Sequence, residues 1–253
     1  MSTLNRCIRI VQILLYYFNL IGLGALLLAA TLAALPLLLA PRQLRQPVVQ
    51  FGISAVCWLL LASLSACRLM YFDLRALDQL NRRRRLLLVP NHPSLIDAFL
   101  VLSRVPRAIC LMKASISTNI FLGAGAHLAG YVSNRDPHGM FRAAIDAVER
   151  GNLLMIFPEG TRTTRQPVSP MLGSVGLIAR KAGAPLQTIL ITTNSPYLSK
   201  GWKIWRPPQF PVYYRAELGR CIEAEATASA TAASLQQYFE QALKLSIDPA
   251  MTL

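Results

Sequence analysis

The sequence has few acidic residues, few histidines and no paired cysteine motif. Its 253 residues include 12 Asp and Glu against 26 Lys and Arg, so the formal net charge is +14. Only three residues are histidine, and the five cysteines form no C-x-x-C pair. A zinc site and a disulfide framework therefore have no support in the sequence. We expect no metal ion, and we expect the cysteines to be reduced and structural.

Nucleophile and dinucleotide motifs are missing as well. No serine or cysteine stands in a G-x-S-x-G turn, so a covalent intermediate has no clear nucleophile. Gly123, Gly125 and Gly130 do not form the glycine fingerprint of a dinucleotide site. His127 and His138 have no acid at a useful spacing. We therefore expect no cofactor, and direct attack by a substrate group is the simpler chemistry.

The basic excess indicates a negatively charged partner, which is nucleic acid, anionic lipid or an acidic protein surface. The densest basic run is residues 82–85. A solvated run of charge at a membrane edge explains it better than contact with an acidic carrier. A membrane-tethered nucleic-acid binder is a weaker alternative, because interleaved aromatics and a recognition motif are absent. We expect membrane lipids, and no nucleic acid, as partners.

Two long stretches lack charge altogether. Residues 10–40 and 48–67 contain no Asp, Glu, Lys or Arg, and both exceed the roughly 18 apolar residues that indicate a membrane-embedded helix. The link between them, residues 41–47, carries two prolines and two arginines, so we expect it to break the helix at an interface. The sequence therefore predicts an N-terminal membrane-embedded helical hairpin.

The flanking basic residues predict how this hairpin is oriented. They place both chain termini and the globular body on the cytoplasmic side of the cytoplasmic (inner) membrane. Whether the hairpin crosses the bilayer stays open, because Gly22, Gly24 and Pro36 would also let the helices bend and remain in one leaflet. A cleaved signal peptide is the weaker alternative, since its apolar core normally spans about 7 to 15 residues.

Short apolar runs alternate with helical periodicity after residue 86, which is typical of an α/β fold with a largely parallel sheet flanked by helices. The predicted strands are residues 86–89, 108–112, 153–157 and 186–192, and the clearest predicted helices are residues 140–150 and 228–245. Residues 202–211 are predicted to form a surface loop that touches the membrane. We divide the chain into a two-helix membrane anchor, residues 1–75, and an α/β domain, residues 76–253.

A histidine and an acid stand five residues apart in the first block, NHPSLID, residues 91–97. Ser94 followed by Asp97 is also a helix-capping signal, so a helix is expected to begin near Ser94. Capping leaves His92 unexplained. In the turn after a strand, Asp97 would reach back to the imidazole and fix its tautomer. Such a pair is a general base for a hydroxyl group.

A second short block, FPEGTR at residues 157–162, follows the predicted strand 153–157. Glu159, Thr161 and Arg162 are thus displayed at the end of a strand. An arginine there binds a phosphate or carboxylate in bidentate fashion, and Gly160 lets the backbone approach a ligand closely. The alternative is a surface turn in which the glutamate and the arginine form a weak ion pair.

NHPSLID and FPEGTR together resemble the first and third blocks of the glycerolipid acyltransferase superfamily, whose best-known members are the 1-acylglycerol-3-phosphate O-acyltransferases. The likeness spans residues 86–193 and also implies an N-terminal hairpin. It implies that His92 is the general base, that Asp97 orients it, and that the acceptor's phosphate is bound by Glu159, Gly160, Thr161 and Arg162 with Arg135 upstream. The acyl donor would be acyl-CoA or acyl carrier protein, as a co-substrate.

The chain departs from the family pattern in three places. Asn134 replaces a common acid before Arg135, residues 171–174 read MLGS where a basic residue is frequent, and Thr188 replaces a proline. These departures bear on the acceptor more than on catalysis. The sequence therefore predicts a membrane-bound O-acyltransferase for a lysophospholipid-like acceptor, and the alternative is a catalytically silent lipid-binding or scaffold protein of the same fold.

Overall fold

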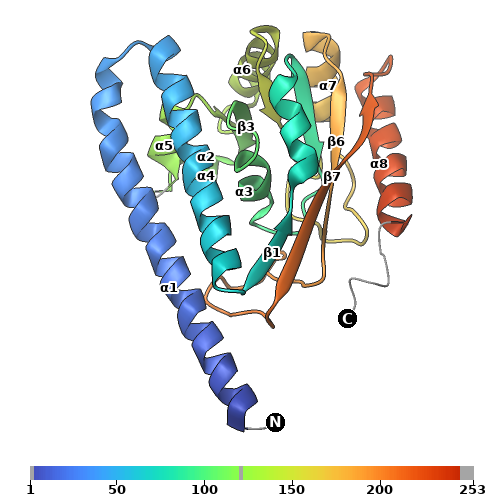
Figure 1. Cartoon of the computed structure of the whole chain (residues 1–253). Coiled ribbons are helices and arrows are strands. Elements are labelled where there is room, and N and C mark those ends of the chain that lie inside the picture. The colour runs from blue at the N-terminus through green and yellow to red at the C-terminus, as the bar shows by residue number, and fades with distance from the viewer. Residues whose placement is uncertain (1–2, 120–121, 246–253) are drawn as a thin grey trace.

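The computed structural model describes residues 3–119 and 122–245, which form a long helical hairpin packed beside an α/β body (Figure 1). The helices are α1 (Thr3–Ala34), η1 (Leu35–Leu39), α2 (Arg42–Ala66), η2 (Arg75–Arg82), α3 (Asp97–Leu102), α4 (Ala114–Ser117), α5 (Gly123–Leu128), α6 (Pro137–Glu149), α7 (Gly173–Ala182) and α8 (Ala228–Leu245). The strands are β1 (Met70–Asp73), β2 (Leu86–Pro90), β3 (Ala108–Met112), β4 (Val132–Ser133), β5 (Leu153–Met155), β6 (Leu186–Thr193) and β7 (Val212–Ile222).

The seven strands form one sheet in the order β1-β7-β6-β2-β5-β3-β4. Every pairing is parallel except that of β6 with β7. The prediction of a largely parallel sheet flanked by helices is therefore confirmed. All four predicted strands are present, with small differences in their ends. Strands β1, β4 and β7 were not predicted.

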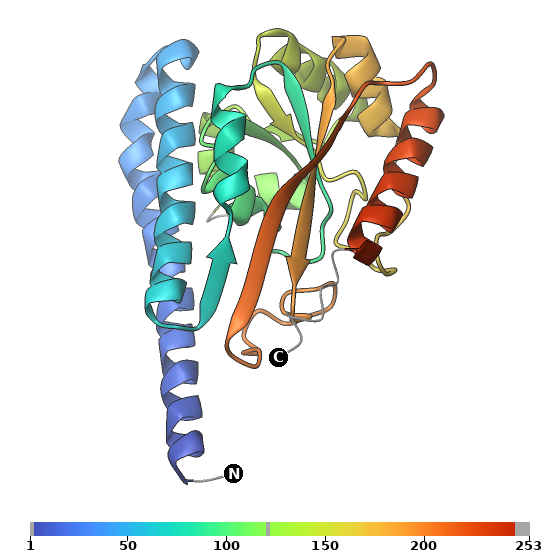
Figure 2. The same ribbon diagram turned by 45° about the vertical axis from the view of Figure 1, so that its right-hand side comes forward.

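The sheet separates two apolar clusters, and the buried residues of β2 alternate between them. Leu86 and Leu88 join the cluster that includes residues of α2 and α3. Leu87 and Val89 join the cluster that includes residues of α6, α7 and α8. Figure 2 shows the hairpin and α8 on opposite sides of the sheet. A strand covered on both faces has no polar alternation, which is why the sequence of β2 is a continuous apolar run.

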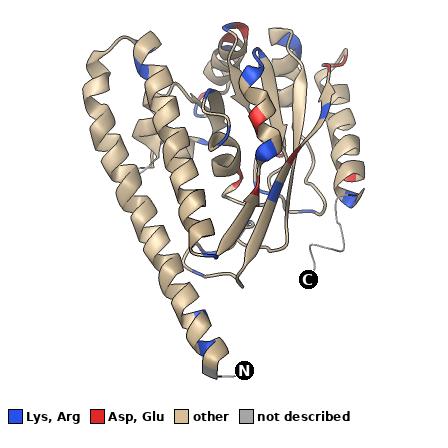
Figure 3. Ribbon diagram, in the orientation of Figure 1, with Lys and Arg blue, Asp and Glu red and all other residues tan. Residues whose placement is uncertain are grey.

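The two hairpin helices are long and apolar enough to cross a membrane, by length and composition. Figure 3 shows almost no charge along them except near the tip of the hairpin and the N-terminus. The most apolar window of α1 is 0% buried, whereas that of α2 is 39% buried. Helix α2 therefore packs one face on the α/β body, while α1 leaves most of its apolar surface uncovered.

The predicted link of the hairpin is wrong in detail. The break in the α-helix lies at η1 and Pro41, and α2 already begins at Arg42 and contains Pro47. Pro41 has an extended backbone, so it separates η1 from α2. Pro47 removes only one backbone hydrogen bond near the start of α2, so the helix continues through it. Strand β1 lies before residue 76, so the sheet begins within the segment assigned to the anchor. The division of the chain into two domains stays a prediction.

Candidate active site

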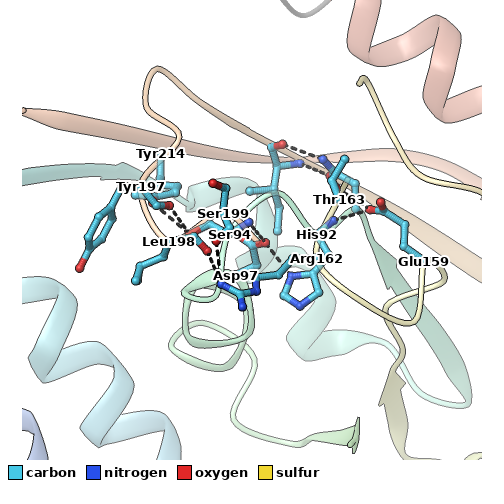
Figure 4. A network of polar contacts seen from close by, with 12 residues as sticks. His92, Ser94, Asp97, Glu159, Arg162, Thr163, Tyr197, Leu198, Ser199 and Tyr214 are labelled. Carbon is cyan, nitrogen blue, oxygen red and sulfur yellow. Dashed lines mark hydrogen bonds and ion pairs between the residues drawn. The ribbon is translucent and has the colours of Figure 1, made fainter. Parts of the chain in front are cut away.

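The two sequence blocks meet at one edge of the sheet. Strand β2 leads into His92 and strand β5 leads into the turn that contains Arg162. Because β2 and β5 are neighbouring parallel strands, their carboxyl ends lie together. Open α/β sheets bind their ligands at this edge. Figure 4 shows side chains of both blocks beside the loop that follows β6.

His92 and Asp97 form a direct pair. The His92 Nδ1 atom lies 2.8 Å from the Asp97 Oδ2 atom, and the same oxygen accepts a hydrogen bond of 2.7 Å from the Ser94 N–H. The imidazole stacks on the Phe157 ring with 3.9 Å between centroids, and 14% of the His92 side chain is exposed. Among residues 3–119 and 122–245, no group hydrogen-bonds the His92 Nε2 atom. This nitrogen is therefore available to a substrate.

The helix begins later than predicted. Its first residue is Asp97 rather than a residue near Ser94, and Ile96 occupies the N-cap position without a side-chain cap. The Asp97 carboxylate makes one half of a capping box by accepting from the Ser94 N–H. The other half is missing, because the Asp97 N–H donates to the Ser94 carbonyl oxygen at 3.3 Å and not to the Ser94 hydroxyl, which itself donates to the Tyr197 carbonyl oxygen at 2.9 Å. Residues 92–96 thus form a turn that leaves the imidazole at the sheet edge.

Burial acts against the charge of Asp97. The residue is 0% exposed, and burial raises the pKa of its carboxyl group, while hydrogen bonds from His92 and from the Ser94 N–H lower it in part. In the described residues the second oxygen, Oδ1, accepts no hydrogen bond. A buried carboxylate of this kind has a strong requirement for a cationic neighbour. A protonated imidazole would meet that requirement.

Glu159 is buried, and its carboxylate binds the backbone of His92. Its Oε1 atom accepts hydrogen bonds from the His92 N–H at 2.8 Å and the Thr163 hydroxyl at 2.9 Å, and its Oε2 atom accepts from the Ser169 N–H at 2.8 Å. The Thr163 N–H in turn donates to the His92 carbonyl oxygen at 2.7 Å. Glu159 and Thr163 therefore bind both backbone polar groups of His92. That Glu159 binds substrate directly stays a prediction.

The turn around Gly160 depends on glycine. Gly160 has φ +64°, and a Cβ atom added there would lie 2.5 Å from the Leu172 Cδ1 atom. Thr161 follows, half-buried. The Arg162 Nη1 atom donates to the carbonyl oxygens of Leu198 at 2.9 Å and Ser199 at 2.8 Å. Arg162 is therefore held at the sheet edge by backbone groups.

Arg135 lies further along the same edge. It is exposed after β4 and lines a cavity of about 630 Å³ together with Met112, His127 and Ser133. Within the described ranges no hydrogen bond joins Arg135 to the other predicted site residues. The structure thus brings together His92, Asp97, Glu159, Gly160, Thr161 and Arg162, whereas Arg135 lines a cavity to which none of these residues contributes.

Several residues that hold the site were not recognised in the sequence. The Asn91 side chain binds both backbone groups of Ile191. Its Nδ2 atom donates to the Ile191 carbonyl oxygen at 2.9 Å, and its Oδ1 atom accepts from the Ile191 N–H at 2.7 Å. Ser94 is bound to Tyr197, and Thr163 to Glu159. Asn91 and Ser94 lie in the first block, but their partners lie about a hundred residues away. No local spacing reveals such contacts.

The basic run at residues 82–85 lies at the other edge of the sheet. It precedes β2, whereas His92 follows it. A five-residue strand spans about 16 Å at roughly 3.3 Å per residue. The run therefore does not face the imidazole. In the described part of the chain, no three His, Cys, Asp or Glu side chains are grouped as metal ligands.

Comparison with known proteins agrees with this arrangement. Residues 72–192 match the family model described as Acyltransferase. The crystal structure of the 1-acyl-sn-glycerophosphate (LPA) acyltransferase PlsC from Thermotoga maritima is similar in fold, with a TM-score of 0.69 and 18% sequence identity over 94% of this chain and 96% of that one. Residues 72–192 are therefore an acyltransferase domain by their family match, and the chain as a whole shares the fold of that PlsC structure.

Proposed function

We propose that this acyltransferase moves a fatty acyl group from an acyl thioester to the hydroxyl of a lysophospholipid-like acceptor, with His92 as the general base. The observation that carries the proposal is the 2.8 Å contact between His92 Nδ1 and Asp97 Oδ2. Because Asp97 holds Nδ1, Nε2 is the ring nitrogen left for a substrate. A hydroxyl within hydrogen-bond reach of that nitrogen loses its proton as it attacks.

The reaction proceeds as a single displacement. The acceptor oxygen attacks the thioester carbonyl carbon while Nε2 takes its proton, and a new ester bond forms as the carbon–sulfur bond breaks. The departing sulfur then receives the proton from the imidazolium. Asp97 holds the imidazole in one tautomer and stabilises the cation between these two steps. No protein nucleophile is needed.

Arg162 supplies a positive charge for an anionic head group. Its Nη1 atom is committed to the backbone of Leu198 and Ser199, and its remaining N–H groups make no hydrogen bond within the described residues. Those groups are suited to bind phosphate oxygens. Residues 171–174 contribute no basic side chain, so head-group binding falls to Arg162, with Arg135 at the adjacent cavity. We propose acyl-CoA or acyl carrier protein as donor.

The hairpin places the enzyme in its membrane. Helix α2 buries residues along its length against the α/β body, from Val49 to Leu64. A hairpin that crossed the bilayer upright would carry the attached body into lipid. The packing therefore favours a hairpin that lies within one leaflet, with the exposed face of α1 in lipid. The flanking basic residues favour the cytoplasmic side.

A substrate panel tests the proposed function. Purified enzyme in lipid vesicles is supplied with labelled acyl-CoA or acyl carrier protein and with an anionic or a neutral lyso-acceptor, and products are identified by mass. We expect a diacylated product with the anionic acceptor, and Arg162→Ala should raise the KM for that acceptor more than for the neutral one. Equal loss with both acceptors would contradict the head-group role.

A further inference from the structure

Helix α1 makes polar contacts that an anchor does not need. Among its described side chains only Tyr16 and Asn19 are buried. The Tyr16 hydroxyl donates to the Ile204 carbonyl oxygen and accepts from the Tyr197 hydroxyl at 3.3 Å. The Tyr17 hydroxyl donates to the Trp205 carbonyl oxygen at 2.8 Å. All of these partners belong to one segment, residues 194–211, which we call the β6–β7 loop.

The other side of the β6–β7 loop holds the active site. The Tyr197 carbonyl oxygen accepts from the Ser94 hydroxyl, and the Leu198 carbonyl oxygen accepts from the Leu95 N–H at 3.0 Å and from Arg162. In Figure 4 the Tyr197 ring points away from the His92–Asp97 pair while its backbone faces Ser94. One short segment of loop is thus bound to the catalytic turn on one side and to α1 on the other.

The backbone of the loop is specialised for this arrangement. Leu198 has φ +58°, a conformation that is unfavourable for a residue with a side chain, and it is only 6% exposed. Such a conformation persists where surrounding contacts fix it. The contacts here are the Leu95 N–H, the Arg162 guanidinium and the α1 tyrosines that hold the neighbouring residues. Tyr16 packs edge-on against Tyr197 and beside Phe210, with 6.2 Å and 5.9 Å between ring centroids.

We infer that Tyr16 and Tyr17 are positioning residues for the anionic-acceptor subsite: they seat the β6–β7 loop, and the loop aims Arg162. This inference rests on the proposed function, in which Arg162 binds the acceptor's anionic group. Helix α1 then belongs to the active site as well as to the membrane anchor. The hydroxyl groups carry the effect, because the rings alone would still fill the same space.

Tyr→Phe variants of the full-length enzyme in vesicles test the inference. Tyr16→Phe and Tyr17→Phe each remove hydrogen bonds to the loop and keep the ring. Tyr71→Phe is the matched control, because its hydroxyl makes no hydrogen bond among the described residues and its ring stacks on Tyr213 in the sheet. KM and kcat are measured with lysophosphatidic acid and with a neutral monoacylglycerol. Each tyrosine variant is measured with Arg162 intact and again combined with Arg162→Ala.

We expect the double Tyr16→Phe, Tyr17→Phe variant to raise the KM for lysophosphatidic acid by about two- to tenfold, the effect of one lost hydrogen bond or two. Tyr71→Phe should leave it unchanged. In the Arg162→Ala background the tyrosine changes should have no further effect on this KM, since coupled residues are not additive. A merely structural role would lower kcat with both acceptors alike and would persist without Arg162.

The outcomes separate the two claims. If Arg162→Ala leaves the KM for lysophosphatidic acid unchanged, the head-group role in the proposed function fails. If Arg162→Ala raises it but the tyrosine variants do not, or if their effect is additive with Arg162→Ala, the inference is overturned and the proposed function stands.

Discussion

The Asp97 carboxylate is fully buried, and only its Oδ2 atom accepts hydrogen bonds from the described residues. A position of this kind lowers stability, because an ionised group has lost its water without full compensation. It is useful in a catalytic pair, where the strongest compensation comes from the imidazolium formed during the reaction. Stability and activity therefore make opposite demands on this residue.

Asp97→Asn should separate these two demands. The amide cannot stabilise an imidazolium, so we expect acyl transfer to fall by about 10²- to 10⁴-fold, the usual contribution of general-base catalysis. The pKa of Asp97 is raised in the folded protein, so stability is greatest below the ordinary aspartate range and falls as the pH rises toward the folded-state pKa. The Asp97→Asn variant has no titrating carboxyl group at this position, so its stability should not show this decrease with rising pH.

The measurement is thermal unfolding of both proteins across this pH range, beside their transfer rates. A variant that keeps near-normal activity, or a wild-type midpoint that rises with pH where the variant's does not, would contradict the account of Asp97.

Glu159→Gln tests whether the third block positions His92. The carboxylate accepts from three protein donors, and an amide would place an N–H group against one of them. We expect a loss of about 1–3 kcal/mol in the free energy of unfolding and a lower kcat, because His92 shifts. Glu223→Gln is the control and should change neither, because Glu223 is exposed just after β7 and makes no ion pair among the described residues. Denaturant unfolding and initial rates check both, and a purely KM effect would favour direct substrate binding by Glu159.

At the scale of elements, the turn after β5 is built for a glycine. Gly160→Ala should destabilise the protein mainly through a left-handed backbone, and to a smaller extent because the added Cβ meets the end of the exposed Leu172 side chain, which must shift. Gly151→Ala is the matched control, because Gly151 has φ +86° with nothing within 4 Å of an added Cβ. Gly151→Ala should lower the free energy of unfolding only through the strained left-handed backbone, by about 1–2 kcal/mol. Adding Leu172→Ala to Gly160→Ala should bring its stability toward that of Gly151→Ala, and no recovery would contradict the collision.

Strands buried on both faces were predicted well from the sequence, as were the amphipathic helices α6 and α8, whereas the half-exposed strand β7 was not. Strands β2, β3 and β5 are continuous apolar runs bounded by turn residues or charges, a pattern that predicts buried strands. Strand β7 alternates buried residues with exposed ones, including Arg215 between Tyr214 and Ala216. It was therefore not recognised. Strands β1 and β4 have only four and two residues, too few for a pattern.

The site follows the same logic. The pairing of His92 with Asp97 was predictable because both residues lie in one turn, five residues apart. The internal bonding of Glu159 and the contacts of Ser94 and Arg162 with the β6–β7 loop depend on residues from distant parts of the chain. Only the tertiary fold brings those residues together.

For the whole molecule, the packing of α2 on the α/β body is the basis for the proposal that the hairpin lies within one leaflet. We expect its tip to stay in the leaflet that faces the body. A cysteine at Gln43, in a variant without the natural cysteines, should not react with a membrane-impermeant maleimide added to the opposite side of sealed vesicles. In a second variant, Cys221 is the single cysteine that is kept. It is exposed on the α/β body, so its labelling shows on which side of the vesicle membrane the body lies. Labelling of position 43 from the opposite side would show a spanning hairpin.

The central claim is that the His92 imidazole takes the proton from the acceptor hydroxyl. The most direct test compares acyl transfer by His92→Ala and by His138→Ala, which changes an exposed histidine of α6 away from the two blocks. We predict that His92→Ala lowers kcat by about 10²- to 10⁴-fold while His138→Ala transfers acyl groups normally. A His92→Ala enzyme that retains its rate, folded and membrane-bound, would contradict the account.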